Sequence, residues 1–164
     1  MSSTAPFLAP MLNVLLPVVV GGLLGLAGGL IGPPYLHRLQ QRAERKKRQA
    51  EKFEELVNAL YQHSHWLNVM KDVQVFGSDD QLTMSPMARV QAISLVYFPE
   101  FDAQIRELDS VADKYELWAL QAKQKRLDAD PKYAEGNAEA YKPYTQTFYS
   151  LVKELNAYAR REFR

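Results

Sequence analysis

The chain has 164 residues, a formal net charge of +1 and no cysteine. This length accommodates one domain of ordinary size plus an anchor, and it is too short for two such domains. The lack of cysteine excludes disulfide bonds, thiolate catalysis and cysteine-ligated zinc or iron–sulfur sites.

The charged residues are distributed very unevenly along the chain. Residues 2–37 contain no Lys, Arg, Asp or Glu, and six of the eight glycines lie within residues 21–32. Residues 38–52 contain seven basic and two acidic residues, a local charge of +5. Residues 53–164 contain thirteen basic and seventeen acidic residues, a local charge of −4. A basic neck therefore joins an apolar segment to a mildly acidic body.

Residues 11–36 are predicted to form a transmembrane helix. About 20 apolar residues suffice to cross a hydrocarbon core of ~30 Å, and this run is longer. Pro33 and Pro34 suit the far boundary of the span, and Tyr35 suits the headgroup level. A cleaved signal peptide is a weaker interpretation, because residues 1–10 have no positively charged side chain. A buried helix in water is also weaker, since each glycine costs about 1 kcal/mol relative to alanine.

The basic residues after the span give it a direction. Cytoplasmic flanks carry an excess of Lys and Arg, so residues 1–10 are expected outside and the neck, residues 37–52, inside. The neck contains Arg38, Arg42, Arg45, Lys46, Lys47, Arg48 and Lys52. We expect a single-pass protein of a bacterial inner membrane whose domain, residues 53–164, is cytoplasmic.

The glycines of the span form a seven-residue near-repeat, GGLLGLA followed by GGLIGPP. At 3.6 residues per turn, Gly21, Gly25, Gly28 and Gly32 fall within about 60° of arc, and Gly29 widens this face. Small residues at such spacing let two membrane helices approach closely, so this face favours self-association or docking on another helix. The alternative is that glycine is simply common in membrane spans.

Residues 36–70 are predicted to form one long helix that contains the neck. Its apolar residues recur every three or four positions: Leu36, Leu39, Ala43, Ala50, Phe53, Val57, Leu60 and Leu67. This stripe fits either a short parallel coiled coil or packing on later helices. The neck charges suit orientation and a solvated helix face, or contact with anionic lipid headgroups. Nucleic-acid binding is not expected, because the basic run is short and an acidic body follows it.

The body is predicted to be all-α. Residues 75–86 read as a loop, and Val73, Val75 and Phe76, before Gly77, form at most a short strand. Ser85 and Pro86 signal the start of an apolar helix, residues 87–98, whose inner face is predicted to hold Val90, Ile93, Val96 and Tyr97.

Two longer helices complete the body. Residues 100–127 carry the stripe Phe101, Ile105, Leu108, Ala112, Tyr115, Ala119 and Ala122. Residues 128–143 read as a linker, and Pro143 is predicted to open the last helix, residues 143–164. This helix is predicted to bury Phe148, Leu151, Val152, Leu155, Tyr158 and Ala159. We predict a transmembrane helix followed by a roughly four-helix cytoplasmic bundle.

No catalytic, cofactor or metal site is predicted. His63 and His65 are two positions apart, so on a helix they point about 200° apart and do not share a metal. Trp66 and Trp118 could line a ligand groove, although aromatic residues at helical spacing more often belong to a core.

The leading hypothesis is a membrane-anchored interaction, scaffold or accessory protein that contacts lipid and a protein partner or a second copy of itself. The alternatives are a membrane-active oligomer, such as a pore, toxin or exclusion factor, and a small ligand-binding or enzymatic bundle.

Overall fold

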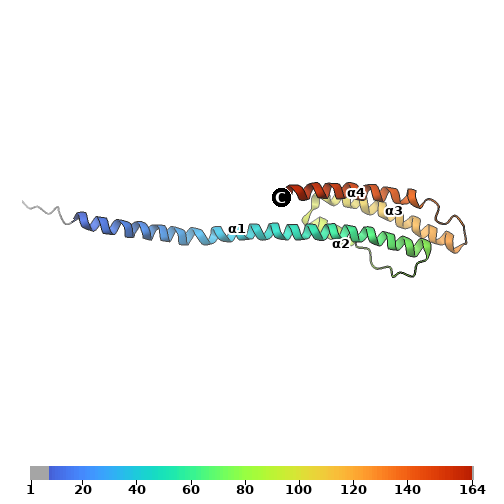
Figure 1. Cartoon of the computed structure of the whole chain (residues 1–164), viewed down its shortest axis with the longest axis horizontal. Helices are drawn as coiled ribbons and strands as arrows, with labels where there is room; N and C mark the ends of the chain where they lie inside the picture. Colours follow the sequence, from blue (N-terminus) through green and yellow to red (C-terminus); the bar gives the residue numbers. More distant parts are fainter. Residues whose placement is uncertain (1–7, 164) are drawn as a thin grey trace, which may run out of the picture. The chain divides into compact units, whose positions relative to one another are not determined.

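The computed structural model describes the backbone of residues 8–163 and the side chains of residues 37, 38 and 40–163. Every element within these residues is helical, which confirms the predicted all-α class for this part of the chain (Figure 1). The elements are α1 (Leu8–Lys71), the π-helical turn η1 (Asp72–Phe76), α2 (Met87–Tyr97), the 3₁₀ turn η2 (Pro99–Phe101), α3 (Asp102–Leu127) and α4 (Asn137–Glu162). The chain divides into two compact units, Met1–Arg48 and Gln49–Arg164.

The backbone of α1 runs through the predicted span, residues 11–36, into the predicted neck helix. The span itself lies outside the residues whose side chains are described. Among the residues that the structure does describe, no helix is both long enough and apolar enough to cross a membrane.

The unit Gln49–Arg164 is a bundle of four antiparallel helices (Figure 1). Hydrogen bonds join consecutive helices around a ring: Arg89 to Glu55 (α2 to α1), Gln91 to Asp109 (α2 to α3), Tyr115 to Asn137 (α3 to α4) and Gln49 to Tyr158 (α1 to α4). Helices α1 and α4 are antiparallel. Gln49 contacts Tyr158 near the end of α4, whereas His63, further along α1, contacts Tyr144 nearer the start of α4. The predicted helical bundle is therefore confirmed.

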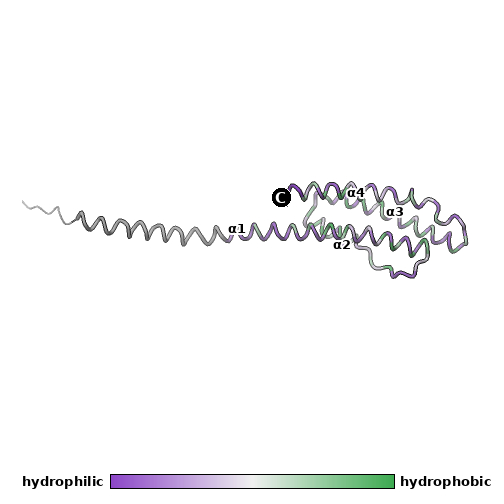
Figure 2. The backbone as a smooth tube through the Cα atoms, in the orientation of Figure 1, coloured by the Kyte–Doolittle hydropathy of each residue, from purple (hydrophilic) through white to green (hydrophobic). Residues whose placement is uncertain are grey.

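Hydrophobic and hydrophilic residues are interspersed along the bundle helices (Figure 2). Buried apolar residues from all four helices form one core. All seven residues of the predicted α3 stripe are buried. The core of α1 includes the predicted Phe53, Leu60 and Leu67 together with Leu56, Ala59, His63 and Met70. The buried residues of α1 and of α3 recur every three or four positions, because a helix has 3.6 residues per turn and this spacing places them on one face.

Two predicted boundaries are wrong. The short strand considered at Val73–Phe76 is instead the π-helical turn η1, which continues α1, ends at Phe76 and is followed by Gly77. Gly77 has φ 75°, a left-handed conformation that favours glycine at the end of a helix. The last helix begins at Asn137, after Gly136 with φ 85°, so Pro143 lies inside α4. Pro143 is exposed, so water can hydrate the carbonyl that loses its helical donor there.

Candidate interaction surface

Helix α2 carries apolar side chains on two opposite faces. The buried face consists of Met87, Val90, Ile93 and Ser94. The exposed face, which we call the α2 outer face, consists of Ala88, Ala92, Leu95 and Val96. Leu95 is 62% exposed and Val96 is 68% exposed. Large apolar side chains exposed next to one another on a helix are typical of an interaction surface.

The prediction that Val96 and Tyr97 lie on the inner face of this helix is wrong, because the side chain of Val96 is 68% exposed and that of Tyr97 is 37% exposed. The helix ends at Tyr97, and Phe98 leaves the helical conformation with φ −141° and ψ 57°. The ring of Phe98 is fully buried and packs against Phe53 and Tyr158. Phe98 therefore occupies the core position that the sequence pattern assigned to Val96 and Tyr97.

The α2 outer face borders a groove of about 450 Å³. The groove is lined by Ala88, Gln91, Ala92, Leu95, Asp102 and Arg106. The alanines leave it open on the α2 side, because their side chains end at Cβ. A hollow therefore lies next to the projecting side chain of Leu95.

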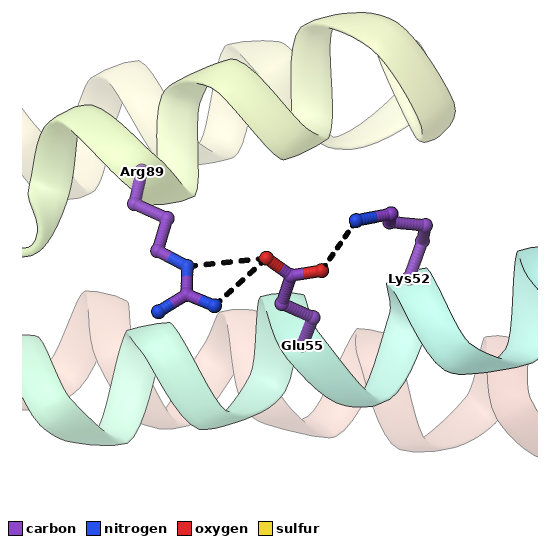
Figure 3. A network of polar contacts seen from close by, with 3 residues as sticks. All are labelled: Lys52, Glu55 and Arg89. Atoms are coloured by element: carbon purple, nitrogen blue, oxygen red, sulfur yellow. Dashed lines mark hydrogen bonds and ion pairs between the residues drawn. The ribbon is translucent and has the colours of Figure 1, made fainter.

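Three basic and two acidic side chains form ion pairs around this surface. Arg106 pairs with Asp102 across 2.6 Å at the groove. On the α1 side, Arg89 and Lys52 both bind the carboxylate of Glu55, at 2.8 and 2.6 Å (Figure 3). The hydrogen bond from Lys52, followed by that from Arg89, lowers the pKa of Glu55. These pairs fix the polar border of the apolar face.

The predicted neck residues are placed differently from one another. Arg38, Arg42, Arg45, Lys46, Lys47 and Arg48 are exposed on α1. Lys52 belongs to the bundle, where its ammonium group binds Glu55 and lies 5.8 Å from the ring centre of Tyr97. Lys52 therefore stabilises the contact of α1 with α2 as well as adding positive charge.

The predicted helix-packing face, formed by Gly21, Gly25, Gly28, Gly29 and Gly32, lies outside the residues whose side chains are described. Its role in helix association stays a prediction from the sequence.

The two histidines of the bundle point in different directions, as predicted. His63 is 1% exposed, and its Nδ1 lies 3.2 Å from the hydroxyl oxygen of Tyr144. Burial lowers the pKa of His63 from 6.5 to about 4. His65 is exposed on the opposite side of α1. Within the described residues, no three His, Asp or Glu side chains gather closely enough to hold a metal ion.

A second groove, of about 340 Å³, lies beside Trp66. Its lining comes from α1 and the loop before α2: Gln62, His65, Trp66, Val69, Gln81, Thr83 and Pro86. The indole Nε1 of Trp66 donates a hydrogen bond to the carbonyl oxygen of Thr83 at 2.7 Å, which holds the loop on α1. Trp118 does not line this groove and stacks on Tyr115. The volume is at the lower end for small-molecule sites.

Comparison of the chain with protein-family models, with curated proteins and with solved structures finds no match. Its function is therefore argued from its own residues. The α2 outer face was missed in the sequence because Val96 was assigned to the inner face of this helix together with Val90 and Ile93.

Proposed function

We propose that the protein is a membrane-anchored helical interaction protein, a scaffold or accessory subunit that holds a binding surface at the membrane. In this proposal residues 11–36 cross the membrane once, residues 1–10 lie outside, and the bundle is cytoplasmic. The observation that carries the proposal is the segment 2–37, which has no charged residue and is followed by a neck of charge +5.

The bundle supports the interaction part of the proposal. Its α2 outer face exposes Leu95 and Val96 beside a groove, with ion pairs on both borders. Apolar side chains with a polar border are the usual composition of a protein–protein contact. The six exposed basic residues of the neck add attraction to anionic headgroups, about 1 kcal/mol for each residue near the surface.

The anchoring and its direction are tested by cysteine labelling, because the native chain has no cysteine. Ser2→Cys and Ala157→Cys are expressed separately and treated with a membrane-impermeant maleimide. We expect labelling of the Ser2→Cys variant in intact cells, and of the Ala157→Cys variant only after permeabilisation. Release of the protein from membranes by alkaline carbonate would contradict the anchor, and the reverse labelling pattern would contradict its direction.

The interaction role is tested by affinity capture of the full-length protein from native membranes. We expect a reproducible partner or a second copy of the chain. A protein that is monomeric both in detergent and in bilayers, and that recovers no reproducible partner, would contradict this role.

A membrane-active oligomer is a second candidate, favoured by the glycine pattern of residues 21–32. A glycine face can assemble more than two helices. The span has no charged residue that would line a water-filled path, which weighs against conduction. Liposomes containing residues 1–52 that leak ions would favour this candidate, and tight liposomes would remove it.

A further inference from the structure

We propose that Tyr144 and His63 form a redox-active pair, which holds one oxidising equivalent as a buried tyrosyl radical. A continuous row of aromatic rings joins this pair to the surface of the bundle, and its geometry carries the inference. The activity goes beyond the proposed anchoring and interaction role and does not rest on it.

The row crosses the bundle from α1 through α4 to α3, and each ring contacts the next. In order, its members are Trp66, His63, Tyr144, Tyr141, Tyr115 and Trp118. Successive ring centres lie 5.9, 5.7, 5.5, 4.9 and 5.6 Å apart. Tyr144 is buried, whereas Trp66 and Trp118 at the two ends are partly exposed. The row therefore gives an electron a path of short steps between the surface and Tyr144.

The composition of the row differs from that of the other aromatic cluster in the core. That cluster consists of four phenylalanines and one tyrosine: Phe53, Phe98, Phe101, Phe163 and Tyr158. The row itself contains no phenylalanine, although Phe148 borders it at Tyr144. A phenylalanine ring packs as well as a tyrosine ring, and a buried hydroxyl group is unfavourable unless it is hydrogen-bonded. What Tyr144 adds to packing is an O–H group that can lose an electron and a proton together.

The hydroxyl group of Tyr144 has a proton acceptor within reach, because its oxygen lies 3.2 Å from Nδ1 of His63. Burial lowers the pKa of His63 to about 4, so its ring is neutral near pH 7 and one nitrogen can accept a proton. Burial raises the pKa of Tyr144, and a hydrogen bond from Ser64 partly opposes this rise. We assign the imidazole proton to Nε2, because Ser64 then donates to the Tyr144 oxygen and Tyr144 donates to Nδ1.

The reaction moves one electron and one proton. A one-electron oxidant, such as an organic peroxyl radical, takes an electron from Trp66 at its groove and becomes a peroxide anion, which water protonates. Tyr144 passes an electron to the Trp66 radical cation, and the O–H proton of Tyr144 moves to Nδ1 of His63. The products are a neutral tyrosyl radical and an imidazolium ion. An oxidised phenol is a far stronger acid than this imidazolium, so the proton transfer is favourable.

The same burial makes the pair reversible. Because the buried site disfavours the charged imidazolium, His63 returns its proton when a one-electron reductant restores Tyr144. The pair thus holds the oxidising equivalent away from the surface without a permanent change in either side chain.

The first test is flash oxidation of the full-length protein in mild detergent, with a photo-oxidised ruthenium polypyridyl complex as the one-electron oxidant. We expect a long-lived neutral tyrosyl radical by electron paramagnetic resonance (EPR), and its loss in Tyr144→Phe. Tyr149→Phe is the matched control, because Tyr149 lies on the same helix but is 66% exposed and off the row. Both variants keep the ring, and circular dichroism checks their helix content. Equal radical yields in the two variants, or no tyrosyl radical in the native chain, would overturn the proposal.

The second test identifies the proton acceptor in the native chain, so it does not depend on the folding of a Tyr144 variant. The three histidines are labelled with ¹⁵N, and pulsed EPR measures the coupling of the radical to nitrogen and to exchangeable protons. We expect coupling to one ¹⁵N nucleus and a proton coupling that disappears in D₂O. His63→Gln is expected to abolish the nitrogen coupling, whereas His65→Gln, an exposed control on the same helix, keeps it. A native radical without nitrogen coupling would overturn the pair.

The row is tested separately by the rate at which the radical forms. Trp66→Phe combined with Trp118→Phe removes the oxidisable ring at each end and keeps an aromatic side chain there. We expect slower formation of the Tyr144 radical in this double variant than in the native chain. An unchanged rate would rule out the row as the path of the electron.

Discussion

The stability of the bundle is expected to depend on pH through His63. The side chain is 1% exposed, its Nδ1 is within hydrogen-bond distance of the Tyr144 hydroxyl, and its ring stacks on Trp66 at 5.9 Å between ring centres. Burial lowers the pKa of the folded state to about 4, whereas an unfolded histidine keeps a pKa of about 6.5. As pH falls below about 6.5, the unfolded chain binds the proton first, so the free energy of unfolding decreases until about pH 4.

The size of this effect follows from the pKa difference of about 2.5. Each unit corresponds to 1.36 kcal/mol, so His63 is expected to reduce the stability by about 3 kcal/mol between pH 7 and pH 4. The measurement is urea unfolding of the full chain in mild detergent, followed by tryptophan fluorescence. Both tryptophans, Trp66 and Trp118, lie in the bundle and report on its packing. His63→Gln removes the titrating group and is expected to remove most of this loss.

The control is His65→Gln, because His65 is exposed and faces away from the core. This variant is expected to keep the pH dependence of the native chain. Burial raises the pKa of Asp109 and Glu116, which stabilises the folded state as pH falls and partly offsets the effect of His63. Comparison of variants at each pH cancels this offset. Equal pH dependence in the native chain and in His63→Gln would refute the reasoning.

Two further predictions concern single hydrogen bonds and turns, each measured as a change in the free energy of unfolding at pH 7. Tyr115→Phe removes the 3.0 Å hydrogen bond to Asn137 and is expected to cost about 1 kcal/mol; no loss would contradict its role in joining α3 to α4. Gly77→Ala and Gly136→Ala each place an alanine at positive φ. Each is expected to lower the free energy of unfolding by about 1–2 kcal/mol. Gly77→Ala should cost more, because its Cβ would lie 2.5 Å from Arg126 Nη1, and the reverse order would contradict this.

The sequence predicted the core best where one helix has one clear apolar face. Along η2 and α3 all seven predicted positions are buried, because polar residues fill most of the remaining positions and leave the 3–4 spacing as the clearest pattern. In α1 the pattern missed Leu56 and Ala59, which widen the stripe, and His63, whose polar ring is buried only because Tyr144 offers it a hydrogen bond. Such a pairing joins residues 81 positions apart and leaves no local signal.

The start of α4 shows how two valid start signals compete. Pro143 suits the first turn of a helix, and the prediction placed it there. Gly136 lies seven residues earlier and adopts a left-handed conformation directly before Asn137, where the helix begins. The earlier start adds residues 137–142 to the helix, which packs Ala140 and Tyr141 against the core and brings Asn137 within reach of Tyr115. The gain from these contacts exceeds the loss of one exposed helical hydrogen bond at Pro143.

The error in α2 has a different origin and bears on function. The segment from Met87 to Phe98 carries apolar residues around most of its circumference, so its pattern suits apolar surroundings on more than one face. The bundle provides such surroundings for one face only, since Phe98 turns into the core and leaves Leu95 and Val96 outside. A pattern of hydrophobicity shows where apolar side chains lie around a helix, and it does not show which of them the rest of the chain buries.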